Sequence, residues 1–69
     1  MKIWIYESRS APSAAYYNFS DARKQQDEDN RMTVEEILED QGEWAVEGSE
    51  EEGFFSIDDG GSIDLVEVQ

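Results

Sequence analysis

Residues 47–61 read EGSEEEGFFSIDDGG, and this stretch decides the fold because it contains a short apolar segment between two turns. In FFSI, Phe55 and Ile57 share one face, which is the alternation of a β-strand with one buried side. DDGG is typical of a tight hairpin turn, and GSEEEG of a looser one. The stretch therefore predicts the middle strand of an antiparallel meander, with carboxylates on its turns and outer faces.

Similar alternations flank this strand on both sides. In EWAVEG, Trp44 and Val46 share one face, and in SIDLVEV, Ile63 and Leu65 do so. The first segment leads into the GSEEEG turn, and the second follows the DDGG turn. We therefore predict a three-stranded antiparallel meander, with Trp44 among its core residues.

The N-terminal part predicts a strand, a loop and a helix. KIWIYES alternates, with Ile3 and Ile5 on one face, and predicts a strand that can join the same sheet. SRSAPSA, around the only proline, predicts a loop. From Ala14 to Arg31 the chain favours a helix whose frayed end is the polar run QQDEDN. In this helix Tyr16, Phe19 and Ala22 recur at spacing three, and the candidate N-caps are Ser13 and Ser20.

The segment TVEEILEDQG has the clearest local signal. Thr33 and Glu36 form a capping box, and Gly42 is a good helix terminator. The predicted helix runs from about Val34 to Gln41. Its stripe at helical spacing consists of Val34, Ile37, Leu38 and Gln41.

These segments predict one α+β domain over residues 1–69. It consists of an N-terminal strand, one or two helices, and a three-stranded antiparallel meander packed on the helix. A chain of 69 residues is near the size at which one hydrophobic core only just offsets chain entropy.

The charge is divided sharply along the chain. Residues 1–31 contain all five basic residues and five acidic ones, whereas residues 32–69 contain 13 acidic residues and no basic residue. The net charge of −13 therefore belongs to the C-terminal half. Aromatic residues and clear periodicity in that half argue against a disordered acidic tail. Phosphate groups would be repelled, so we expect no direct binding to nucleic acid.

The residue types present argue against several classes of function. The chain has no cysteine and no histidine, and its carboxylates share one kind of environment, so we expect neither an enzyme nor a cofactor. The N-terminal apolar run is shorter than a signal peptide requires, and no segment approaches the length of a membrane span. We therefore expect a soluble intracellular protein that does not bind a membrane.

A calcium loop is one alternative for residues 56–67. Gly61 and Glu67 fit its glycine and its last ligand position, but Ser56 and Gly60 stand where acidic ligands are expected. The flanking segments alternate as strands do. A hairpin turn is the favoured interpretation, and no metal site is expected.

The functional hypothesis for the acidic half is mimicry of a nucleic-acid backbone. A carboxylate, like a phosphate, accepts two hydrogen bonds from arginine. Residues i and i+2 on a strand are about 6.7 Å apart and helical i,i+4 neighbours about 6 Å apart, spacings that resemble steps along a phosphate chain. The predicted helix carries like-charged i,i+4 pairs, a stability cost where lysine would be favourable. The pairs are Glu35/Glu39, Glu36/Asp40 and Glu39/Glu43.

In size, charge and α+β pattern, the chain resembles the small acidic anti-CRISPR proteins of phages and mobile elements that mimic DNA. Among these it is most similar to inhibitors of type I Cascade, and we suspect subtype I-C. The resemblance implies a monomer in the host bacterial cytoplasm that occludes the surface of Cascade where the PAM and duplex DNA bind.

The candidate partner-binding residues form two acidic clusters. The partner is expected to be a positively charged DNA-binding surface of a host defence protein, such as a Cascade subunit. Two other hypotheses stay open: a DNA-mimic inhibitor of a restriction or DNA-repair enzyme, and an acidic accessory module that binds a basic protein. The clusters are Glu35, Glu36, Glu39, Asp40 and Glu43 on the helix, and Glu47, Glu50, Glu51, Glu52, Asp58 and Asp59 at the turns.

Overall fold

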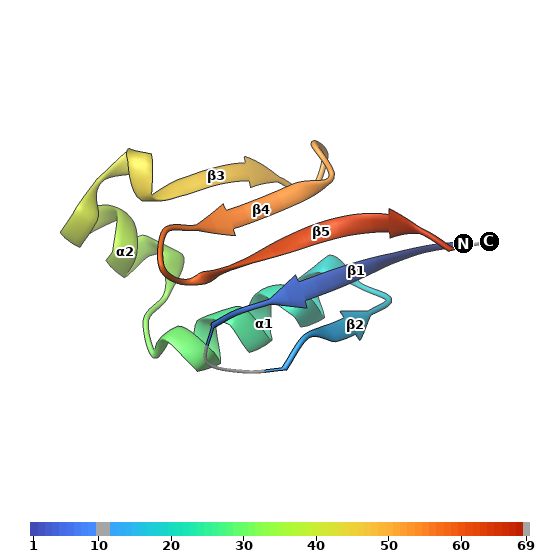
Figure 1. Ribbon diagram of the computed structural model, residues 1–69. Coiled ribbons are helices and arrows are strands. Elements are labelled where there is room, and N and C mark those ends of the chain that lie inside the picture. Colours follow the sequence, from blue (N-terminus) through green and yellow to red (C-terminus); the bar gives the residue numbers. More distant parts are fainter. Residues whose placement is uncertain (10–11, 69) are drawn as a thin grey trace.

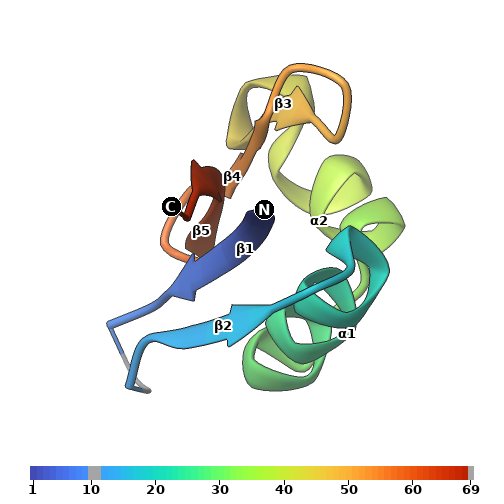
Figure 2. The same ribbon diagram turned by 90° about the vertical axis from the view of Figure 1, so that its right-hand side faces the viewer.

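A computed structural model describes residues 1–9 and 12–68 of the chain. Its strands are β1 (Lys2–Glu7), β2 (Ala14–Tyr16), β3 (Val46–Ser49), β4 (Phe54–Ile57) and β5 (Gly61–Glu67), and its helices are α1 (Phe19–Asn30), α2 (Val34–Gln41) and the short 3₁₀ helix η1 (Glu43–Ala45). The strands form one antiparallel sheet in the order β2-β1-β5-β4-β3 (Figure 1). Both α-helices lie on the same face of the sheet (Figure 2). The predicted α+β class is confirmed, and β1 belongs to the same sheet as the meander.

The two longest strands, β1 and β5, pair at the centre of the sheet. This pairing joins segments from opposite ends of the sequence, so Met1 and Val68 lie side by side. The Val68 N–H donates to the Met1 carbonyl at 2.6 Å. Because β1 and β5 pair at the centre, β2 and β3 form the two edges of the sheet.

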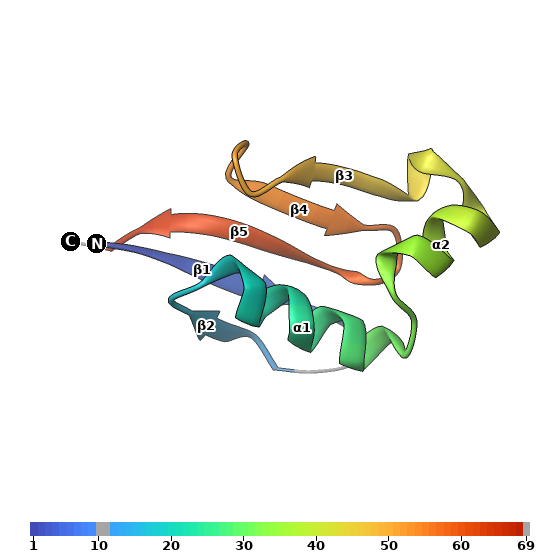
Figure 3. The same ribbon diagram turned by 180° about the vertical axis from the view of Figure 1, so that it is seen from behind.

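α1 packs on β1, β2 and β5, as seen from behind in Figure 3. Trp4, Tyr6 and Ile63 point from the sheet into this layer, and all three are buried. Ala22 is fully buried and allows close approach of the helix. The ring of Phe19 meets that of Trp4 edge-on, with centroids 4.8 Å apart.

Polar side chains of α1 attach the helix to the sheet. Gln26 is fully buried, and its amide donates to the Gly61 carbonyl at 3.1 Å. Asn30 donates to the Gly60 carbonyl at 3.1 Å. The prediction that QQDEDN is a frayed helix end is therefore wrong, because these residues have partners on the β4–β5 turn and on β5.

A second polar contact joins α1 to β1. The Tyr6 hydroxyl donates to the Asp29 carboxylate at 2.7 Å, and Gln25 donates to the other oxygen of Asp29 at 3.0 Å. Burial first, and then the hydrogen bond to Asp29, raise the pKa of Tyr6 above 10.0. The neutral form of the tyrosine is therefore the one that the fold stabilises.

The start of the predicted first helix is wrong. Ala14–Tyr16 is the edge strand β2, in which Tyr16 pairs with Trp4, so the spacing of Tyr16 to Phe19 and Ala22 is not a helical repeat. α1 begins only after Asn18, which replaces the predicted serine caps. Of the predicted loop at 8–14, residues 10 and 11 lie outside the described part and Ala14 already belongs to β2.

The second helix is confirmed at the predicted bounds. The Thr33 side chain accepts a hydrogen bond from the Glu36 N–H at 3.3 Å, and Gly42 ends the helix with a φ of 98°. The predicted stripe is only partly buried. Ile37 is 3% exposed, whereas Leu38 is 36% exposed and Gln41 is also exposed.

The predicted strand at EWAVEG begins later than expected. Gly42 is followed by the 3₁₀ turn η1, in which the Ala45 N–H donates to the Gly42 carbonyl at 3.2 Å. This turn places Ala45 in the core beside Ile37 and Ile57, and turns Trp44 outward. Trp44 is 67% exposed, so the prediction that it is a core residue is wrong.

Candidate functional site

The predicted site residues all lie at the surface. Each of the 11 carboxylates belongs to an exposed residue, on α2, η1, β3 or one of the two hairpin turns. Asp64 and Glu67 on β5 are exposed as well, although they were not among the predicted site residues. The alternation of SIDLVEV, which places Asp64 opposite Ile63, was the signal that could have identified Asp64.

The structure groups these carboxylates differently from the prediction. The turns at 50–53 and 58–60 lie at opposite ends of β4, so the predicted turn cluster is divided. The Asp58 N–H donates to the Ala45 carbonyl at 2.7 Å, which places the 58–60 turn beside η1 and the end of α2. Glu47 lies on β3 between the two ends, on a strand of four residues that spans about 13 Å.

The carboxylates form an acidic surface around α2, β3 and β4. β3 is the sheet edge opposite β2, but two basic residues lie close to acidic ones: Lys2 on β1 is in register with Glu67 of β5, and Arg9 lies beside the β4–β5 turn. The sequence division of charge is therefore only partly a spatial division.

Within the described residues, one ion pair reaches this surface. Arg9 approaches Asp59 at 3.5 Å, but the two side chains are 92% and 77% exposed. A pair this open to solvent contributes little to stability. By contrast, Arg23 on α1 pairs with Asp27 at 3.0 Å in a half-buried setting and lies over the Phe55 ring at 4.6 Å.

Two of the predicted carboxylates also stabilise their own turns. The Thr33 hydroxyl, which caps α2 by accepting from the Glu36 N–H, also donates to the Glu36 carboxylate at 3.2 Å. Glu52 repeats this arrangement with Ser49, whose hydroxyl accepts from the Glu52 N–H at 3.3 Å and donates to its carboxylate at 3.4 Å. The sequence pattern did not predict this second side-chain contact because it lies in a hairpin turn and not at a helix.

The sheet face opposite the helices is uncovered by any described element. Along this face the strand register gives an apolar pair, Ile3 and Val66, and then a row in which Asp64 lies between Ile5 and Phe54. The next row is polar. It consists of Glu7, Ser62, Ser56 and Glu47.

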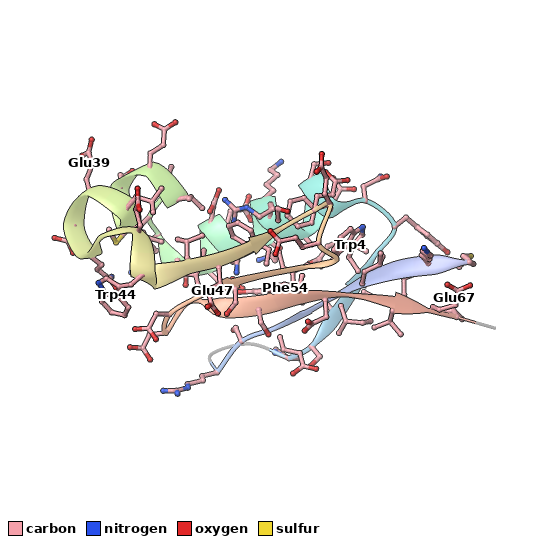
Figure 4. All side chains as sticks on the ribbon, turned by 90° about the horizontal axis from the view of Figure 1, so that it is seen from above. Trp4, Glu39, Trp44, Glu47, Phe54 and Glu67 are labelled. Carbon is pink, nitrogen blue, oxygen red and sulfur yellow. The ribbon has the colours of Figure 1, made fainter. Side chains whose placement is uncertain are left out.

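Trp44 borders the acidic end of this open face. A small hollow of about 90 Å³ is lined by Trp44, Ala45, Glu47, Ser56 and Asp58. Figure 4 shows Trp44 on the side of the sheet away from α1, while Trp4 points toward the helix layer. The acidic surface therefore contains a large and strongly exposed aromatic side chain.

The predicted hairpin turn at DDGG is confirmed. Ile57 pairs with Gly61 across a turn of Asp58, Asp59 and Gly60, so residues 56–67 form strand, turn and strand instead of a calcium loop between helices. Among residues 1–9 and 12–68, no group of three or more acidic side chains is arranged to hold a metal ion. In the same residues, no helix is long and apolar enough to cross a membrane.

No protein-family model, no curated protein and no solved structure matches this chain. The chemistry of the surface itself must therefore support any functional conclusion. Exposed carboxylates on a rigid sheet and helix can accept charge-assisted hydrogen bonds from arginine and lysine.

Proposed function

We propose that this protein is an anti-CRISPR inhibitor that mimics the DNA backbone with surface carboxylates. In this proposal it occludes the surface of a type I Cascade complex, of subtype I-C, at which the PAM and duplex DNA bind. The observation that carries the proposal is the exposure of all 13 acidic residues of the basic-free segment 32–69 on folded elements.

The amount of charge supports this proposal. The molecule is 40 Å long. A DNA duplex of that length carries about 24 phosphate charges, at about one per 1.7 Å, and one side of it presents about 12. The 13 carboxylates are a similar number. These carboxylates lie on both the helix side and the open face of the sheet (Figure 4), so a basic groove that contacts one side would meet part of this charge.

The rigidity of the scaffold also supports it. The acidic turns are tied to the β-sheet, and α2 is capped at both ends. Fixed carboxylates lose less conformational entropy on binding than those of a disordered acidic tail. Counterions released from both surfaces would then favour association at low salt.

A competition assay tests the proposal. Purified type I-C Cascade and labelled PAM-containing duplex DNA are titrated with this protein at about 50 mM and about 200 mM salt. We expect loss of DNA binding, with an inhibitory concentration that rises at least about tenfold at the higher salt. Normal DNA binding at saturating protein would overturn the proposed target.

One observation favours a second candidate, an acidic accessory module that binds a basic protein through apolar contacts. The open sheet face exposes Phe54, Val66 and Val68 by 36%, 42% and 38%. Such a module would bind with weak salt dependence, and Val66→Ser would weaken it more than reversing a charge on α2. The salt series of the competition assay separates this candidate from the DNA mimic.

A further inference from the structure

Trp44 is a large apolar side chain that is exposed to solvent. It is 67% exposed, whereas the other tryptophan, Trp4, is 6% exposed. A domain of this size has few large apolar side chains to bury, and tryptophan is among the residues that most often dominate binding interfaces. Its exposure within the acidic surface therefore indicates a role in binding a partner.

The indole of Trp44 lies beside Gly42, on backbone that is tied to the β4–β5 turn. A Cβ atom at Gly42 would lie 3.3 Å from Cδ1 of Trp44, and the φ of Gly42 is 98°, a value that favours glycine. On the other side, the hydrogen bond from the Asp58 N–H to the Ala45 carbonyl fixes η1 to the β4–β5 turn. The backbone that carries the indole is therefore tied to the sheet, and the ring lies beside Gly42.

The surroundings of the ring are negatively charged. Glu47 and Asp58 line the same hollow as Trp44, together with the Ser56 hydroxyl. The face of an indole attracts a cation within about 6 Å of its centre, and a carboxylate beside it can accept hydrogen bonds from the same group. Arginine fits both features, because its planar guanidinium stacks on aromatic rings and binds carboxylates bidentately.

Charge complementarity decides which kind of molecule can bind in the hollow beside Trp44. A nucleic acid would bring phosphates to a chain of net charge −13, and a second copy would bring another −13. A protein surface with arginine side chains is complementary to the hollow. We propose that Trp44 and this hollow anchor an arginine of a basic protein partner. The inference rests on the proposed function for the identity of that partner, and it adds the contact residue and the side-chain type.

A peptide titration tests the anchor without Cascade. Hexa-arginine and hexa-lysine are added at low salt while tryptophan emission is recorded, and the variant Trp44→Phe reports Trp4 alone. We expect hexa-arginine to change the Trp44 emission at a concentration at least about threefold lower than hexa-lysine. Glu47→Gln with Asp58→Asn should raise that concentration at least about threefold. Equal responses to the two peptides, or an unchanged response in the double variant, would overturn the anchor.

The competition assay with Cascade supplies the second test. Trp44→Ala should raise the inhibitory concentration at least about tenfold, and Trp44→Leu should not restore it, because leucine keeps apolar area without a π face. Tyr17→Ala is the matched control, since Tyr17 is 75% exposed but lies outside the acidic surface. It should change inhibition less than about twofold. Melting temperatures verify that each variant is folded.

The two proposals fail separately. If wild-type protein does not displace DNA from Cascade but hexa-arginine binds beside Trp44, the proposed function fails and the anchor stands. If wild type inhibits Cascade and Trp44→Ala inhibits equally well, the anchor fails and the proposed function stands.

Discussion

Two regions of this molecule, one around α1 and the other around α2 and β3, use polar side chains in opposite ways. On the α1 side, Gln26, Asp29 and Asn30 are hydrogen-bonded to β1, β5 or the β4–β5 turn. On the α2 and β3 side, the carboxylates are exposed, and one ion pair, Arg9 with Asp59, reaches them within the described residues. Polarity therefore stabilises packing on the first side, whereas on the second it is presented to solvent at a cost in stability.

The largest expected effect separates the core from the exposed tryptophan. Ile63→Ala removes a fully buried side chain between the sheet and α1, and should lower the free energy of unfolding by about 2 to 5 kcal/mol. Trp44→Ala should change it by less than about 0.5 kcal/mol, although it removes a larger side chain. Urea unfolding measures both. A loss at Trp44 as large as that at Ile63 would contradict the assignment of Trp44 to the surface.

The next effect compares two glutamines. Gln26→Ala removes a fully buried side chain and its hydrogen bond to the partly buried Gly61 carbonyl, and should cost about 1 to 3 kcal/mol of unfolding free energy. Gln41→Ala, at an exposed position of α2, should cost little. Equal losses of unfolding free energy in the two variants would mean that polar side chains contribute no more to stability on α1 than on α2.

A smaller effect concerns Tyr6 and alkaline pH. Its pKa in the folded protein is raised above 10.0, so its contribution to stability is complete below that value and is lost as pH rises through the folded pKa. The free energy of unfolding should therefore fall as the pH rises above about 10, and that of Tyr6→Phe should fall less steeply. Tyr17→Phe is the control, because Tyr17 is exposed. The same slope in Tyr6→Phe as in wild type would be evidence against this linkage.

The smallest effect is on helix electrostatics. Glu39→Lys, in the last turn of α2, turns the repulsive pair with Glu35 into an attractive one, and should raise the unfolding free energy by about 0.5 kcal/mol. Glu28→Lys on α1 should lower it by a similar amount, because Glu28 stands four residues after Lys24. Thermal unfolding at low salt measures the difference. A lower unfolding free energy in the α2 variant than in wild type would show that α2 is not under electrostatic strain.

The fold was predictable wherever local signals were strong. The capping box at Thr33 and the terminator Gly42 give the bounds of α2, and alternation identifies β1, β4 and β5. The edge strand β2 was missed because three residues, AAY, carry no period, and its pairing with β1 depends on contacts across a loop. The role of Gln26 was missed for a similar reason, since its partner Gly61 is 35 residues away.

The candidate site was predictable in composition but not in arrangement. The absence of basic residues after Arg31 was enough to identify the exposed carboxylates. Their division between the two ends of β4 follows from strand order, which the local pattern does not contain. Trp44 was assigned to the wrong face because the 3₁₀ turn after Gly42 shifts the alternation by one residue and places Ala45 inside.

The most direct test of the account compares two double charge reversals in the Cascade competition assay. Glu39→Lys with Asp40→Lys changes the acidic surface and places each lysine four residues after a glutamate in the last turn of α2. Asp21→Lys with Glu28→Lys makes the same change in net charge at exposed positions of α1. The account predicts that the first variant raises the inhibitory concentration at least about tenfold, with a melting temperature equal to or above that of wild type. It predicts that the second inhibits within about threefold of wild type. Equal loss of inhibition in both variants, or full inhibition by the first, would contradict the claim that the α2 and β3 side is the surface that binds the partner.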